Sequence, residues 1–283
     1  MLLPTAPGRA VYMTQAATID YSNANEGYIT VTYTGSLDKR CKARVSKNEW
    51  VFQNFTVYNV ENTQNMQNNG TAVLPLTHGG GDYSIRMYRQ VEGNRYLQIA
   101  AVDITVQLAN PLRPYLYPNT YSWYTANSKC VALSAELCAE AKSDIHKLSA
   151  IYSWVIQNIK YDHDFAKSVL NKEVSWWLPD PDTVLANRKC ICFGYASLFA
   201  AMCRARGIPA QIIVGNVRTP DGMEALHAYN AVYLDTGGNI TPAIRVLPGK
   251  WFRIDATFAA GMPDAQVAAW TAEDDNYRVE YRG

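Results

Sequence analysis

The sequence has little of several features that would indicate a particular class of protein. Its 283 residues include six cysteines, too few to scaffold a chain of this length with disulfides. The formal net charge is +1 and no run of lysine or arginine forms a basic arm, so nucleic acid is not an expected partner. No apolar run is long enough to span a membrane. The composition instead indicates a globular chain, 48% hydrophobic, with one large or two medium domains.

Metal-binding and targeting patterns are also missing. Cys190 and Cys192 form a C-x-C pair without a matching C-x-x-C or H-x-x-x-H, so we expect no metal and no cofactor. Only Met1 to Leu3 precede Pro4, which is too short for the apolar region of a secretory signal. This beginning indicates a cytoplasmic protein, although a secreted protein whose leader has been removed would look the same.

Residues 1–110 show the two-residue alternation of β-strands. Residues 29–34 and 83–89 alternate between apolar and polar, and Gly93-Asn94 joins the second run to a further strand at 96–100. We therefore expect a small β-sandwich in 1–110. The stretch 111–127 contains Pro111, Pro114 and Pro118, which is typical of a connector. A second domain is expected over 128–283.

The second domain alternates between helical and strand periods. Helices are predicted at 131–138 and 144–159, and strands at 210–214, 227–234 and 251–257. Residues 218–224 have the composition of a polar loop. The fold class expected for the whole chain is therefore α+β.

Cys192 lies where a strongly apolar helix begins. Four apolar residues follow at helical spacing and must be buried, namely Tyr195, Leu198, Phe199 and Met202, and Gly207 ends the helix. Unpaired N–H groups and the helix dipole favour a thiolate at such a start and can bind an oxyanion. A buried, inert thiol is the alternative, which we assign to Cys130, Cys138 and Cys203. Cys190 stays a second candidate nucleophile, or a partner for protective oxidation.

His227 is the best candidate base among four histidines. It begins one predicted strand, and Asp255 lies near the end of the next strand. Opposite side chains of adjacent antiparallel strands have Cβ atoms about 5 Å apart, within reach for a carboxylate that orients an imidazole. His163, in a loop flanked by carboxylates, is a weaker candidate.

Four segments in this order resemble the core of the transglutaminase-like superfamily. They are KCICFGYA at 189–196, RGIPA at 206–210, HAYN at 227–230 and WFRIDAT at 251–257. The resemblance covers roughly residues 128–260 and implies a papain-like core, whose nucleophile lies at a helix N-terminus packed against an antiparallel sheet. It implies a triad of Cys192, His227 and Asp255. Cys190 stands where the family often has Gly, and Tyr229 where it often has Trp.

The resemblance implies an acyl-transfer enzyme that acts on peptide or amide bonds through a thioester. A protease or amidohydrolase is the expectation; a cross-linking transglutaminase and a non-catalytic binding module are the alternatives. Substrates would be peptides, proteins or cell-wall peptides. Tyr161, Trp176, Trp177 and Tyr229 are candidates to line the cleft or bind the oxyanion. The resemblance is to bacterial members with an N-terminal β domain, which implies an extracellular or cell-envelope location.

Overall fold

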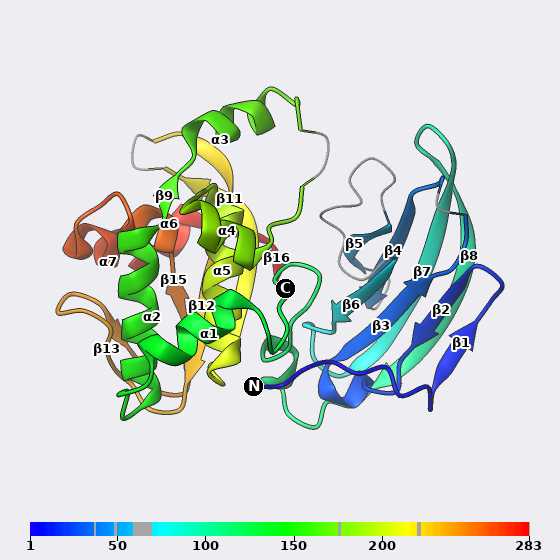
Figure 1. Ribbon diagram of the computed structural model, residues 1–283, viewed down its shortest axis with the longest axis horizontal. Coiled ribbons are helices and arrows are strands. Elements are labelled where there is room, and N and C mark those ends of the chain that lie inside the picture. The colour runs from blue at the N-terminus through cyan, green and yellow to red at the C-terminus, as the bar shows by residue number, and fades with distance from the viewer. Residues whose placement is uncertain (37, 48–49, 59–69, 175–176, 220–221, 283) are drawn as a thin grey trace. The chain divides into compact units, whose positions relative to one another are not determined.

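The computed structural model describes residues 1–36, 38–47, 50–58, 70–174, 177–219 and 222–282. The chain divides into two compact units (Figure 1). Pro4–Thr120 form the N-terminal unit, and Met1–Leu3 with Tyr121–Gly283 form the C-terminal unit. The sequence-based limits of 1–110, 111–127 and 128–283 remain predictions beside this division.

The described residues of the N-terminal unit form two antiparallel four-stranded sheets. The first has the order β1 (Val11–Met13), β2 (Ala17–Asp20), β3 (Tyr28–Tyr33), β6 (Thr71–Pro75). The second has the order β5 (Trp50–Tyr58), β4 (Cys41–Lys47), β7 (Gly81–Glu92), β8 (Arg95–Val106). Alternate residues of β4 and β7 are buried, and strands of the first sheet contact β5 and β8 of the second. The expected strand-rich N-terminal region is thus confirmed, and its two sheets form a β-sandwich.

The C-terminal unit has an antiparallel sheet and seven helices among its described residues. The sheet order is β15 (Lys250–Ile254), β12 (Glu224–Leu234), β11 (Ala210–Arg218), β16 (Tyr277–Arg282). The helices are α1 (Lys129–Leu137), α2 (Asp144–Asn158), α3 (His163–Leu170), α4 (Pro181–Asn187), α5 (Cys192–Ala205), α6 (Ala256–Ala259) and α7 (Asp264–Ala272). Two short pairs complete it, β9 (Lys160–Tyr161) with β10 (Lys189–Cys190) and β13 (Gly238–Asn239) with β14 (Arg245–Val246). Within the described residues, 3₁₀ turns lie at Ala24–Glu26 and Arg113–Tyr115 of the N-terminal unit and at Asp274–Asn276 of the C-terminal unit.

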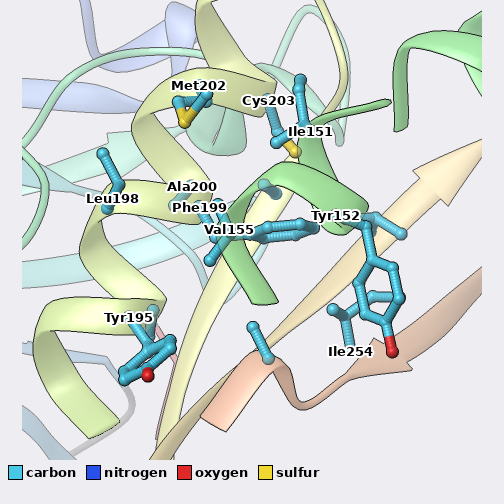
Figure 2. Packing of buried hydrophobic residues seen from close by; sticks show 14 of the residues in the cluster. Ile151, Tyr152, Val155, Tyr195, Leu198, Phe199, Ala200, Met202, Cys203 and Ile254 are labelled. Carbon is cyan, nitrogen blue, oxygen red and sulfur yellow. The ribbon is translucent and has the colours of Figure 1, made fainter. Parts of the chain in front are cut away.

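Helix α5 is the centre of the C-terminal unit. It contacts strands β11 and β12 as well as helices α1, α2 and α4, and its residues from Gly194 to Ala205 are all buried. Figure 2 shows its apolar side chains interleaved with those of α2, with Ile254 of β15 in the same cluster. A helix that is apolar on every side must be covered on every side, which explains this position. The α+β core expected from the sequence is confirmed.

Three buried polar side chains fasten α5 to its surroundings. The Asn230 amide donates to the carbonyl oxygens of Ala196 (3.1 Å) and Gln211 (2.9 Å), which links β12 to α5 and β11. Arg204, fully buried, donates through Nε and Nη2 to the carbonyl oxygen of Ala210 at the start of β11. The Ser122 hydroxyl donates to the carbonyl oxygen of Ser197 (2.8 Å). Buried hydrogen bonds of this kind fix the position of α5 along its axis and its rotation relative to the sheet, and they also stabilise the packing.

Several local predictions need correction. Strand β12 begins at Glu224, so His227 is its fourth residue rather than its first, because the β11–β12 hairpin pairs as far as Arg218 and Glu224. Asp255 lies just after β15 and caps α6. Two further helices, α3 and α4, were not predicted from the sequence; the side chains of Asp162 and Asp180 cap their first turns.

Replacing Asn230 by Ala should loosen α5 from the sheet. The variant loses two buried hydrogen bonds and leaves a small cavity, so we expect the free energy of unfolding to fall by about 2–3 kcal/mol. Urea unfolding followed by tryptophan fluorescence measures this, because six of the seven tryptophans belong to the C-terminal unit.

The matched control is Asn158→Ala. Its amide also donates to a helical carbonyl, that of Trp154, but in an exposed position. We expect a change below about 0.5 kcal/mol there. Equal losses in the two variants would contradict the role assigned to Asn230.

Candidate active site

Cys192 is the first residue of α5 and lines an open cleft. The backbone before it is extended at Ile191, and the helix has no side-chain cap at this end. The N–H groups of Gly194 (2.8 Å) and Tyr195 (3.2 Å) donate to the carbonyl oxygen of Ile191, and the N–H of Cys192 itself begins the helix beside its half-buried thiol. The predicted helix start is confirmed.

His227 connects Cys192 to Asp255. Its Nε2–H donates to Oδ2 of Asp255 over 2.8 Å, and the Cys192 thiol, which lines the same cleft, lies near enough to contribute to the raised pKa of the ring. Because Nε2 is occupied by Asp255, Nδ1 is the ring nitrogen left to exchange a proton with the thiol. Only 8% of the His227 surface is exposed, so this arrangement is largely screened from water. The structure therefore brings the three sequence-predicted residues together.

The pKa of His227 is set by burial on one side and by its carboxylate partner on the other. Burial alone would lower the pKa of the imidazole, but the charge and hydrogen bond of Asp255, with a smaller contribution from Cys192, raise the pKa to about 10. The imidazolium form is therefore favoured at neutral pH, as an ion pair with Asp255.

Asp255 is almost fully buried and its carboxylate accepts three hydrogen bonds. Oδ2 accepts from His227 and from the Tyr277 hydroxyl (3.1 Å), and Oδ1 accepts from the backbone N–H of Phe258 (3.1 Å). A buried carboxylate needs such donors to remain charged. Each donor comes from a different element, namely β12, β16 and α6.

Two of these neighbours, Phe258 and Tyr277, were not found from the sequence. The Phe258 ring stacks on the His227 imidazole with centroids 4.8 Å apart and planes 11° from parallel. A favourable stack with an imidazolium holds the ring plane in place. The capping signal at Asp255, three residues before Phe258, could have indicated the backbone contact. Nothing local marks Tyr277, whose contact depends on strand pairing.

The cleft beside Cys192 has a volume of about 700 Å³. Its walls come from the end of α2, from β9, from the β11–β12 hairpin and from the segment after Asp255. The apolar lining includes Ile156, Leu226, Phe258 and Met262, and Lys160 is the permanently charged residue among the lining side chains described. A cleft of this size is ample for several atoms on each side of a scissile amide.

The aromatic residues predicted to line the cleft or bind the oxyanion lie in different places. Tyr161 lines the cleft with Cys192, and burial, together with the nearby Cys192 and Cys190, raises the pKa of its hydroxyl to about 12, so it stays a donor. Tyr229 is buried behind His227, stacked at a centroid distance of 6.3 Å. Trp177 packs edge-on against Phe165 and Phe193. Trp176 lies outside the described residues.

Cys190 and His163, the second candidates for nucleophile and base, are less well placed than Cys192 and His227. Cys190 is buried on β10, and burial raises the pKa of its thiol, which disfavours a thiolate. His163 lies on the cleft wall, exposed and edge-on to the Tyr161 ring. His227, in contrast, contacts both Cys192 and Asp255. Cys130 and Cys203 are buried as expected, while Cys138 is only partly buried.

Across the described residues, no cluster of three or more His, Cys, Asp or Glu side chains is suited to a metal ion. No helix in the described part of the chain has both the length and the apolar composition required for a membrane span.

Residues 131–256 match the family model described as the transglutaminase-like superfamily. This span includes most of α1, all of α2 to α5, His227 and Asp255. Two curated relatives, the kyphoscoliosis peptidases of Mus musculus and Homo sapiens, are each 29% identical over 157 residues. The match covers 53% of this chain but 21% of each relative, so the chain spans about a fifth of their length.

Three solved structures are similar to larger parts of the chain. A candidate cysteine protease of Cytophaga hutchinsonii has a TM-score of 0.44 and 15% identity, covering 96% of this chain and 73% of its own. Red sea bream transglutaminase has a TM-score of 0.31 and 10% identity, with coverages of 81% and 48%. The periplasmic domain of TgpA from Pseudomonas aeruginosa has a TM-score of 0.32 and 12% identity, with coverages of 88% and 98%.

Replacing Asp255 by Asn should lower the pKa of His227. The amide keeps the shape of the carboxylate but removes the charge that raises the pKa against burial, so the ring should be neutral at pH 7. In the parent protein it should stay protonated on both nitrogens past pH 8. Nitrogen-15 NMR of the imidazoles measures this, with His227→Gln to assign the signal.

The linkage to stability has a definite sign. The folded pKa of about 10 lies above the unfolded value near 6.5, so the stabilisation is fully present below about pH 6.5 and is lost as the pH rises through 10. An Asp255→Asn variant with an unchanged His227 titration would contradict the electrostatic account.

Proposed function

We propose that the transglutaminase-like domain of this chain, at residues 131–256, is a cysteine peptidase or amidohydrolase. The observation that carries the proposal is that Cys192 and His227 lie together on the wall of an open cleft, with His227 hydrogen-bonded to Asp255. A thiol, an imidazole and a carboxylate in this order supply a nucleophile, a general acid and base, and a residue that orients the base.

In the proposed reaction the Cys192 thiolate attacks the carbonyl carbon of a peptide or side-chain amide. As the carbon–nitrogen bond breaks, the His227 imidazolium gives its Nδ1 proton to the leaving amine, and a thioester remains. Water then attacks the thioester while His227 takes up one of its protons. The acid product leaves and the thiolate is restored. Asp255 stays ionised throughout and holds Nε2.

The oxyanion of the tetrahedral intermediate needs two donors. We assign one to the backbone N–H of Cys192, at the start of α5, and the other to the hydroxyl of Tyr161. Support for Tyr161 comes from its place beside Cys192 in the cleft and from its raised pKa, which keeps the hydroxyl protonated. Tyr229, behind His227, is assigned to packing of the imidazole rather than to substrate.

Hydrolysis is proposed over cross-linking because the curated relatives are named peptidases and the sequence has no EF-hand-like loop. The predominantly apolar wall near Leu226 and Met262, with Lys160 at its side, suits a polypeptide with an apolar side chain next to the scissile bond. A cell-wall peptide remains within this class. We keep the extracellular or cell-envelope location as part of the same proposal.

Iodoacetamide should modify Cys192 at pH 6 much faster than an unassisted thiol. A free thiol of pKa about 8.5 is only about 0.3% ionised at that pH, whereas an imidazolium next to the sulfur stabilises the thiolate. We expect His227→Ala to lower the labelling rate at pH 6 by about two orders of magnitude. Mass spectrometry of the labelled peptide identifies the site.

Cys190→Ser is the matched control, since this variant removes the buried neighbouring thiol and should leave the labelling rate unchanged. A Cys192 that reacts only above about pH 8 would indicate a non-catalytic module on the same fold.

A digestion screen with peptides and casein should yield shorter products with the parent protein and none with Cys192→Ala. Addition of a primary amine tests the other fate of the thioester: incorporation of the amine into the substrate would identify cross-linking. Mass spectrometry distinguishes these outcomes. Hydrolysis of a side-chain amide adds about 1 Da to the substrate, cleavage of a peptide bond adds the mass of water, and cross-linking adds the mass of the amine less that of ammonia. Activity that persists in Cys192→Ala would rule out the proposed nucleophile.

A further inference from the structure

The strand that contributes Tyr277 lies outside the residues matched by the family model, yet its hydroxyl reaches the candidate active site. Tyr277 donates to Oδ2 of Asp255 over 3.1 Å, and this is the same oxygen that accepts from His227 at 2.8 Å. The matched residues end at 256, while Tyr277 opens β16. The carboxylate oxygen that faces the imidazole is thus shared by two donors.

The Tyr277 side chain is held on both sides. Only 6% of it is exposed. Its ring meets the Tyr229 ring edge-on at a centroid distance of 4.8 Å, and the Arg253 guanidinium lies 4.2 Å from its centroid. Arg253 is itself anchored by the Thr271 carbonyl (2.6 Å) and Asp274 (2.8 Å). Because packing on both sides fixes the side-chain rotamer, the Tyr277 hydroxyl is already directed at Asp255 in the folded protein.

The register of β16 is set by a close approach of two backbones. Val217 pairs with Tyr277 and Gly215 pairs with Val279. A Cβ atom at Gly215 would lie 2.1 Å from the carbonyl oxygen of Arg278, a distance that no side chain could accept. The strand can therefore come close enough for Tyr277 to reach Asp255 only because residue 215 has no side chain.

We propose that Tyr277 is a positioning residue of the catalytic site, acting through Asp255. Its hydroxyl keeps Oδ2 directed at Nε2 of His227, and it takes up part of the negative charge of that oxygen. The imidazolium is then bound firmly enough to be oriented, but loosely enough to release a proton to the leaving amine. This inference rests on the function proposed above and adds a fourth side chain to it.

The charged and ionisable groups around this pair come from several elements. They are Cys192 of α5, Tyr229 of β12, Arg253 of β15, Tyr152 of α2 and Asp264 of α7. Of these, Arg253 contacts the Tyr277 ring and Cys192 contacts His227. A Tyr277→Phe change leaves all of them in place and removes one oxygen atom.

Tyr277→Phe should lower kcat about tenfold and leave KM unchanged, since a hydrogen bond to a charged group is lost without change to the cleft. The bared carboxylate should hold the proton of His227 more strongly. The alkaline limb of the kcat/KM profile, which reports loss of the imidazolium proton, should therefore move to higher pH. Nitrogen-15 NMR should show the same upward shift in the pKa of His227 without any substrate.

Tyr152→Phe is the matched control. Tyr152 is buried in the core of the same unit (Figure 2), and its hydroxyl has no hydrogen-bond partner among the described residues. This variant should keep the parent kcat and the parent His227 titration. Circular dichroism and urea unfolding report whether each variant folds, and Tyr277→Met replaces Tyr277→Phe if the latter does not.

The NMR titration separates failure of this inference from failure of the proposed function. A parent-like His227 titration and kcat in Tyr277→Phe would overturn the role of Tyr277, whatever the enzyme hydrolyses. A shifted titration in a protein that cleaves no substrate would support the contact with Asp255 and reject the peptidase. If Tyr152→Phe and Tyr277→Phe lowered kcat by the same factor, the inference would also be overturned, because the loss would then reflect a general loosening of the C-terminal unit.

Discussion

The buried charge of Asp255 is the constraint on which the C-terminal unit depends. A carboxylate at 1% exposure is tolerated only when its oxygens are supplied with donors. Three elements meet that requirement together, because β12 brings His227, β16 brings Tyr277 and the first turn of α6 brings the N–H of Phe258. Loss of any of the three donors would leave the carboxylate of Asp255 poorly solvated in the interior. The contacts that arrange the site therefore also stabilise the fold around it.

The second requirement is a fixed position for the sulfur. Cys192 belongs to α5, whose remaining turns are enclosed by helices and sheet, and Asn230 ties that helix directly to the strand that carries His227. Nucleophile and base are therefore joined through a few buried hydrogen bonds rather than through a loop. The substrate side is different, since the cleft wall includes the β11–β12 hairpin and the segment after Asp255, where side chains such as Leu226 are exposed. The nucleophile and the base are thus held by buried elements, whereas the cleft walls that would contact a substrate include exposed segments.

The amino-acid sequence is informative wherever the signal is local. The apolar stripe after Cys192 predicts the helix, and the alternation around His227 and before Asp255 predicts the strands. The grouping of these three residues into a triad comes from the resemblance to the transglutaminase-like superfamily. The errors are also local in origin: the polar hairpin at 218–224 hides the true start of β12, and the cap at Asp255 continues the alternation of a strand. Tyr277 and Phe258 could not be found in this way, because one depends on the return of a distant strand and the other on a short helix that the alternating pattern conceals. Trp177 packs edge-on against Phe165 and Phe193, and its place in the site stays a prediction.

The pairing of β16 with β11 has a practical consequence for work on the isolated domain. A fragment trimmed to residues 131–256 would keep all three residues of the triad but would leave one long side of β11 without a neighbour. Unpaired strand edges of this kind recruit other chains and promote aggregation. Gly215 would make that edge flatter and easier to approach, since it offers no side chain as an obstacle. Expression boundaries should therefore be drawn beyond residue 256, to include the last strand.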